Sequence, residues 1–173
     1  MLFRSMGGNV VNVSTDDQED ADLYGNATGD EKQKPSRLII RDCDLINHAE
    51  LLSKTEIPFT EGKTEVVIDR ITSAASPRQI ERVPAGAQFR LNLILNVWEQ
   101  DGNETTLIDN VFKSLELLKD DYLGGSGSRG YGQVSIEIEK ILEKTTDEYY
   151  GRQKGEIKDR TGEFSDRIHK LKN

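Results

Sequence analysis

The chain has 173 residues, with 23 Lys and Arg against 31 Asp and Glu, so its formal net charge is −8. This length suffices for one domain with a real core, and 35% hydrophobic with 31% charged residues lies at the polar side of the globular range. The negative balance excludes a polycationic protein. Any nucleic-acid site must therefore be a local patch and not the field of the whole chain.

Cysteine and histidine usage narrows the chemistry further. Cys43 is the one cysteine, so no disulfide forms within the chain and no CxxC pair holds zinc. His48 and His169 lie far apart in sequence, and we interpret both as ordinary surface residues. No apolar run approaches the roughly 20 residues that span a bilayer. We predict no membrane association and a reducing, cytoplasmic location.

The first part of the chain is polar. Residues 16–22 carry five acids and no base, which favours a solvated loop or a helix N-terminus over a metal site. Residues 25–36 combine Gly, Asn, Thr, Asp, Lys and Pro, so they predict a loop.

The middle of the chain predicts strands. Residues 38–40 indicate a buried strand, and residues 46–54 have helical or turn character. An alternating strand over 64–71 breaks at 73–78, resumes at 79–83 and stops at 84–86, which indicates a hairpin with a small, flexible tip. Residues 89–98 alternate well, with Phe89, Leu91, Leu93, Leu95 and Val97 on one face of a further strand.

The C-terminal part predicts one helix and one more strand. Thr105 or Thr106 can cap a helix that runs to about Lys119, because apolar residues follow at helical spacing. A glycine-rich segment over 124–132 comes next, and alternation at 134–138 predicts a final strand. Residues 143–173 carry many charges and little apolar periodicity, so we expect a polar, irregular tail.

The glycine-rich segment is the first candidate site. Five glycines in the nine residues 124–132, with serines between them, free the backbone to present amide groups to an anion. The planar fork of Arg129 suits a phosphate, and Tyr131 could stack on a base. The predicted RNA contacts here are Gly125, Gly127, Ser128, Arg129 and Tyr131. A flexible surface loop explains the glycines alone equally well.

The hairpin is the second candidate site. Between residues 63 and 82, four bases stand against three acids, so this stretch is positive within a negative chain. The bases are Lys63, Arg70, Arg78 and Arg82. Small and apolar residues among them could wedge between bases of a nucleic acid: Ile68, Ile71, Ala74, Ala75 and Pro77. Composition alone favours an ordinary charged hairpin.

The order strand, hairpin, strand, helix, glycine loop, strand predicts an α+β fold. It corresponds to most of a ferredoxin-like, or split βαβ, unit. That unit needs one more strand and helix at its front, and no convincing first strand precedes the acidic stretch.

Several motifs together resemble the RAMP superfamily, and most closely the repeated backbone subunit of type III-A (Csm) CRISPR complexes. The segments that carry this resemblance are Leu23-Tyr24-Gly25, Arg37–Asp42, Ile68–Thr72, Pro77–Val83 and the whole stretch Tyr122–Gly132, and the last two together are the specific ones. With their spacing they cover about residues 20–140.

The resemblance implies a ferredoxin-like (RRM-like) RAMP core over 1–142 with an inserted thumb hairpin at about 60–86, followed by the tail. It further implies that copies of the subunit stack along a CRISPR guide RNA with the other subunits of an effector complex. Each thumb would displace one base pair of the duplex between guide and target RNA. Members of the family cut target RNA with an aspartate and a divalent metal, Mg or Mn.

The sequence departs from the family at its start. We find neither the loop that carries the catalytic aspartate nor the Pro-Gly-Ser-Ser-Leu-Lys-Gly-like segment that follows it. We therefore expect an N-terminal segment to be missing, and Asp16, Asp17 and Asp20 match no catalytic position. We assign no catalytic residue and expect no tightly bound metal.

Three readings of the function stay open. The chain could be an RNA-binding subunit without its own cutting activity, or a complete ribonuclease of which this sequence is a shortened form. It could also be an RRM-like adaptor outside CRISPR, or a guide-processing RAMP protein outside the type III-A backbone role.

Overall fold

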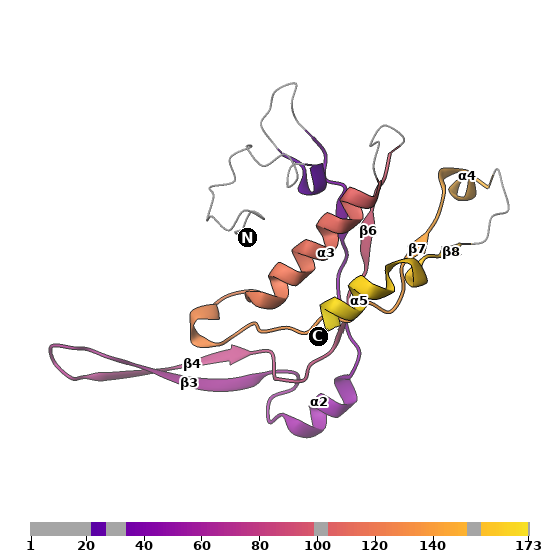
Figure 1. Ribbon diagram of the computed structural model, residues 1–173. Helices are drawn as coiled ribbons and strands as arrows, with labels where there is room; N and C mark the ends of the chain where they lie inside the picture. The colour runs from indigo at the N-terminus through magenta and orange to yellow at the C-terminus, as the bar shows by residue number, and fades with distance from the viewer. Residues whose placement is uncertain (1–21, 27–33, 99–103, 152–156, 173) are drawn as a thin grey trace. The chain divides into compact units, whose positions relative to one another are not determined.

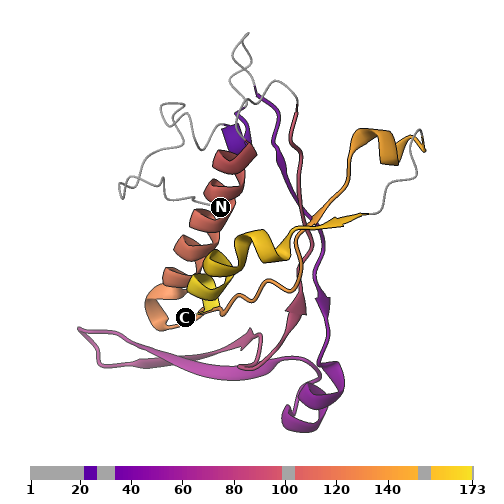
Figure 2. The ribbon, with the colours of Figure 1, turned by 45° about the vertical axis from the view of Figure 1, so that its right-hand side comes forward.

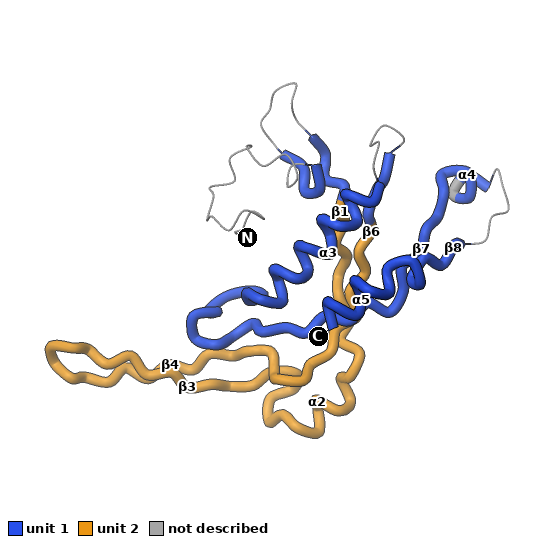
Figure 3. The backbone as a smooth tube through the Cα atoms, viewed as in Figure 1, with its two compact units in different colours: residues 1–37, 95–173 blue, residues 38–94 orange. Residues whose placement is uncertain are grey.

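A computed structural model describes residues 22–26, 34–98, 104–151 and 157–172. The chain divides into two compact units, residues 38–94 and residues 1–37 with 95–173 (Figure 3). Both helices and strands are present, so the predicted α+β class is confirmed, while the ferredoxin-like arrangement stays a prediction. No helix among the described residues is long and apolar enough to cross a bilayer.

Unit 2, residues 38–94, contains a two-stranded ribbon. β1 (Leu38–Ile40) pairs with β6 (Leu93–Leu95), and β2 (Asp44–Leu45) pairs antiparallel with β5 (Phe89–Arg90). The register shifts by one residue between the β1–β6 pair and the β2–β5 pair. In the β2–β5 pair Asp44 lies opposite Arg90, whereas just after β1 the Arg41 N–H donates to the Asn92 carbonyl. Such a shift is the mark of a β-bulge. The single strand predicted over 89–98 is therefore wrong: it is two short strands.

Helix α2 (His48–Lys54) follows β2 and is one part of the predicted helical segment 46–54. Leu51 is its buried residue. Asn47 stands directly before the helix, and its side chain bonds to a distant loop: its amide donates to the Gly86 carbonyl at 2.9 Å and its oxygen accepts the Gln88 N–H at 2.9 Å. These bonds join the helix start to the loop before β5.

The predicted hairpin is confirmed. β3 (Glu61–Ile68) pairs antiparallel with β4 (Ala75–Arg82) over eight residue pairs, from Glu61–Arg82 to Ile68–Ala75 (Figure 1). The break expected at 73–78 is shorter, because β4 already begins at Ala75. The Asp69 N–H donates to the Ala74 carbonyl, so alternation along the ladder makes Pro77 a non-hydrogen-bonded position. Its missing N–H therefore costs no bond of the ladder.

Unit 1, residues 1–37 with 95–173, is built on helix α3 (Glu104–Asp120), which confirms the helix predicted over 105–119. The cap predicted at Thr105 or Thr106 is wrong, because both residues lie inside the helix. α5 (Ser165–Lys172) lies beside it (Figures 1 and 2). Among the described residues of this unit, the buried apolar side chains are Leu23, Leu107, Phe112, Leu115 and Leu171. The α3 residues among them recur at helical spacing, which is why one face of the helix is covered.

The expected irregular tail is wrong for residues 157–172. β7 (Leu142–Glu143) pairs with β8 (Lys158–Asp159), enclosing α4 (Thr146–Tyr149), and a 3₁₀ turn (Thr161–Phe164) leads into α5. Leu171 is only 1% exposed. Sequence periodicity missed this segment because α5 is short and buries its apolar side chains against α3 among many charges.

Ion pairs and one aromatic contact attach the C-terminal segment to α3. Arg167 pairs with Asp109 at 2.9 Å and Lys170 with Glu116 at 2.9 Å. The rings of Phe112 and Phe164 stack with centroids 6.0 Å apart. Both ion pairs are partly exposed, so the buried apolar contacts contribute more to stability than the charges do.

Arg160 sits at the centre of a denser ionic cluster. Its guanidinium, 18% exposed, pairs with Glu104, with Glu163 at 2.8 Å and with Glu143 at 3.5 Å. The hydrogen bond to Glu104, and then that to Glu163, raises the pKa of Arg160 above its ordinary value. The cluster therefore joins the start of α3 to β7 and to the turn before α5.

The strand predicted at 134–138 is not formed as a paired strand. Val134, Ile136 and Ile138 are half-buried and the residues between them are exposed, as the alternation indicated. However, the segment pairs with no strand in the part of the chain that the structure describes. Side-chain alternation predicts the extended backbone but cannot report whether a partner strand is at hand.

Candidate nucleic-acid interface

The glycine-rich segment forms a closed loop in unit 1. The Leu123 N–H donates to the Gly132 carbonyl at 2.8 Å, which joins the two ends of the loop. Gly132 has a φ of +78°, and a Cβ there would lie 2.3 Å from the Leu123 carbonyl oxygen. Glycine is therefore required where the loop closes.

An aromatic ring fills one side of this loop. A Cβ at Gly127 would lie 2.0 Å from Cδ1 of Tyr122, so the Tyr122 ring occupies the space that a side chain at 127 would need. Sequence reasoning did not assign a site role to Tyr122. The signal available was an aromatic residue two positions before a glycine-rich segment.

The predicted contacts of this loop occupy different environments. Gly125, Ser128 and Arg129 are exposed, whereas Gly127 and Tyr131 are half-buried. Arg129 ends a short 3₁₀ turn (Gly127–Arg129), with its N–H bonded to the Ser126 carbonyl at 2.9 Å. The loop thus carries an exposed arginine, while the tyrosine expected to stack on a base is partly covered.

The hairpin tip is ordered by one carboxylate. Oδ1 of Asp69 accepts the N–H groups of Ile71 and Thr72, both at 2.8 Å. The Thr72 backbone bond, followed by that of Ile71, lowers the pKa of Asp69. Ser73 takes a left-handed φ of 57° to complete the turn. This tip is therefore a defined turn where we predicted a flexible one.

Apolar side chains project from the outer half of the hairpin. Ile71 is 94% exposed and Ile68 is 64% exposed. The other residues predicted to act as a wedge, Ala74, Ala75 and Pro77, are exposed as well. An isoleucine exposed to this degree at a rigid tip loses the hydrophobic stabilisation that burial would provide, which is typical of a contact surface.

The four predicted cations of the hairpin are not equivalent. Arg82 pairs with Glu61, directly opposite in the register, at 3.0 Å, and Arg78 approaches Glu65, also opposite, at 3.7 Å. Lys63 lies half-buried on β3 between these two pairs. Arg70 is exposed beside Ile71 and forms no ion pair with any described residue. Because cross-strand carboxylates already pair with Arg78 and Arg82, Arg70 is the hairpin cation best placed to contact a phosphate.

The loop and the hairpin belong to different compact units. Each is a candidate contact by itself, and the structure does not assign them to one shared channel. The acidic residues Asp16, Asp17 and Asp20 lie outside the described residues.

The described residues do not fit a catalytic divalent metal. No group of three or more His, Cys, Asp or Glu side chains among them is arranged to hold an ion. Asp69 uses one carboxylate oxygen to accept two backbone N–H groups, so it acts as a turn residue. We therefore derive no metal-dependent step from these side chains.

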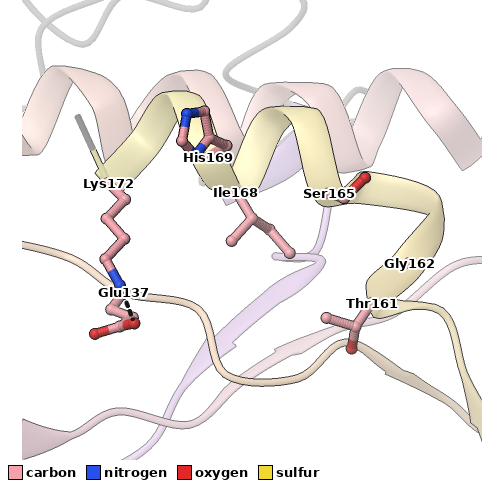
Figure 4. Close-up of a pocket in the computed structure, with 7 residues that line it drawn as sticks. All are labelled: Glu137, Thr161, Gly162, Ser165, Ile168, His169 and Lys172. Atoms are coloured by element: carbon pink, nitrogen blue, oxygen red, sulfur yellow. Dashed lines mark hydrogen bonds and ion pairs between the residues drawn. The ribbon is translucent and has the colours of Figure 1, made fainter.

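A cavity of about 360 Å³ lies between α5 and the segment after the glycine loop (Figure 4). Ser165, Ile168 and His169 of α5 line it, and Lys172 closes one end by pairing with Glu137 at 2.7 Å. None of the predicted RNA contacts lines this cavity. His169, like His48, is exposed.

A sequence profile described as the RAMP superfamily matches residues 2–135, which include both the hairpin and the glycine loop. The chain belongs to the RAMP superfamily, which confirms the resemblance read from its motifs.

Within that family the chain is similar to proteins named CRISPR system Cms endoribonuclease Csm3. It is 46% identical to the one from Streptococcus thermophilus over 116 residues, 66% of this chain and 52% of that protein. It is 32% identical to the one from Methanocaldococcus jannaschii over 149 residues, 84% of this chain and 58% of that protein. It is 35% identical to the one from Mycobacterium tuberculosis over 149 residues, 79% of this chain and 63% of that protein. The chain thus spans about half the length of the curated relatives it matches.

Proposed function

We propose that this chain is an RNA-binding backbone subunit of a type III CRISPR effector complex. The observation that carries this proposal is the family match over residues 2–135, because it includes both candidate contacts and the matched relatives are named Csm3. Guide RNA, target RNA, further copies of the chain and other subunits are the partners that this role requires. In this role the chain holds target RNA in position for cleavage at regular intervals. The family resemblance implies that this cleavage depends on a divalent metal, Mg or Mn.

The glycine loop is the proposed contact with the RNA backbone. Its closed shape keeps backbone amides and the exposed Arg129 on one short segment, and a guanidinium fork suits phosphate oxygens. Contacts of this kind read no sequence, which suits a subunit that must hold guides of any sequence.

The hairpin tip is the proposed thumb. Ile71 offers an exposed apolar group that could take the place of one base in a stack, and Arg70 beside it could neutralise the neighbouring phosphate. The Asp69 turn supports this role because it holds the tip in shape before RNA arrives. A preformed tip loses less conformational entropy on binding.

The loop contact is tested by fluorescence anisotropy with a fluorescein-labelled single-stranded RNA across a salt series. We expect Arg129→Ala to weaken binding and to reduce the salt slope by about 0.7, the value of one phosphate contact on a single strand. Lys54→Ala serves as control, since Lys54 is an exposed base paired with Glu50 at 2.5 Å on α2. An unchanged slope in Arg129→Ala would remove the loop from the RNA site.

The thumb is tested with a guide–target duplex that carries 2-aminopurine, whose fluorescence rises when the base unstacks. We expect the wild-type chain to raise this fluorescence and Ile71→Ser to abolish the rise. Val83→Ser is the matched control, because Val83 is 60% exposed but lies beyond the end of β4. Equal signals from the two variants would contradict the wedge role of the tip.

A further inference from the structure

Trp98, the one tryptophan of the chain, has an indole ring that lies against an arginine. Cζ of the Arg37 guanidinium lies 3.4 Å from the centroid of this ring, well within the roughly 6 Å of a cation–π contact. Trp98 is nevertheless 41% exposed. Because the guanidinium covers one face of the indole, solvent reaches the ring from its other face and its edges.

The backbone around Arg37 holds this stack in place. The Arg37 N–H donates to the Leu23 carbonyl at 2.9 Å, and the Arg37 carbonyl accepts the Asn96 N–H at 2.9 Å. Leu23 is 0% exposed, so the first bond attaches Arg37 to the core of unit 1, to which Trp98 also belongs. The second bond places Trp98 two residues beyond Asn96, and side chains two residues apart on an extended strand share one face. The stacked pair is therefore formed before any ligand binds.

We propose that the open face of Trp98 stacks on one base of a single-stranded RNA, and that Arg37 positions the ring for this contact. The inference rests on the proposed RNA-binding function and adds a contact outside both the glycine loop and the hairpin. Stacking on an aromatic ring accepts any base, which suits a subunit that holds RNA of varying sequence. A ring that is already fixed by Arg37 loses little conformational entropy on binding.

An exposed tryptophan also suits a contact with another protein. The arginine behind the ring favours RNA instead. Sites for single-stranded RNA combine an aromatic face for the base with a cation for the backbone, and Trp98 and Arg37 supply these two groups at one point. A guanidinium also attracts the negative charge of a nearby phosphate.

The test uses the intrinsic fluorescence of the chain, which reports on this ring alone because Trp98 is the one tryptophan. We expect an oligouridylate RNA to quench the fluorescence saturably, with the same dissociation constant that anisotropy of the labelled RNA gives. Trp98→Ala should weaken binding about tenfold, the loss of one stacked base, while Trp98→Phe keeps a ring and should lose less. Tyr150→Ala is the matched control, because Tyr150 is a 71% exposed aromatic residue of the same unit.

Two further readouts separate stacking from charge attraction. Trp98→Ala should leave the salt slope of binding unchanged, because the ring contacts no phosphate, whereas Arg129→Ala should reduce it. Arg37→Lys keeps the charge but loses the planar group that stacks on the indole. We expect this variant to lower the fluorescence anisotropy of the indole in the free chain and to weaken RNA binding, with circular dichroism that shows it folded.

Three results would overturn the proposal and leave the proposed function intact. One is RNA binding by anisotropy without any change in indole fluorescence. Another is an equal loss of affinity in Trp98→Ala and Tyr150→Ala. The third is protection of Trp98 from acrylamide quenching that grows with chain concentration in the absence of RNA, since this would assign the ring to a protein contact. No RNA binding by either method would instead reject the proposed function, and this contact with it.

Discussion

The ring of Tyr122 occupies the space beside the Gly127 Cα, where a Cβ would lie 2.0 Å from the ring. The loop that presents Arg129 is therefore shaped from within by an aromatic contact. This relationship makes the role of one glycine testable without touching any charged group.

We expect Gly127→Ala to lower the free energy of unfolding by about 1–3 kcal/mol, the usual cost of overpacking, and to weaken RNA binding. Gly125→Ala is the matched control, because a Cβ at Gly125 meets nothing within 4 Å. Urea unfolding and RNA anisotropy measure the two effects. If the two variants behave alike, the Tyr122 contact does not shape the loop.

Asp69 should determine the order of the hairpin tip. The Ile71 and Thr72 N–H groups each donate a hydrogen bond of 2.8 Å to the Asp69 carboxylate. We therefore expect Asp69→Ala to speed hydrogen exchange at these two amides. Asp69→Asn keeps an acceptor oxygen and should restore most of the protection. Fast exchange at both amides already in the wild-type chain would speak against a preformed tip.

The C-terminal helix should contribute to the stability of its unit. Leu171 is 1% exposed, so we expect Leu171→Ala to cost about 2–4 kcal/mol through lost burial and a residual cavity. Leu117→Ala on α3, at a position 39% exposed, should cost less than about 1 kcal/mol. Urea unfolding compares the two, and equal losses would mean that α5 does not pack against α3 in solution.

The Arg160 cluster predicts a specific dependence of stability on pH. The hydrogen bond from Arg160 lowers the pKa of Glu163 below its ordinary 4.5. A lowered carboxyl pKa stabilises the fold fully above pH 4.5, and this stabilisation disappears as the pH falls through the lowered pKa.

Arg160→Gln should therefore be less stable than the wild-type chain at neutral pH, with a difference that shrinks in acid. Chemical unfolding at a series of pH values measures this difference. Glu163→Gln should show the same acid convergence from the other partner. A stability difference that stays constant to strongly acidic pH would contradict the role of this pair.

The sequence by itself determined the features that depend on neighbouring residues. Helical spacing predicted α3 between 105 and 119, alternation with turn residues predicted the β3–β4 hairpin, and the motifs within 20–140 identified the RAMP superfamily. Periodicity and turn chemistry act over a few residues, so they can be read without knowing the fold.

Only the tertiary structure decided which residues meet. Arg82 and Arg78 proved to lie opposite Glu61 and Glu65, which left Arg70 as the hairpin cation best placed for phosphate. Tyr122 met Gly127, α5 covered α3 through Leu171, and the segment 133–140 kept its alternation without a partner strand among the described residues. These outcomes depend on the register and packing of segments distant in sequence, and local patterns carry no information about which distant segment is present.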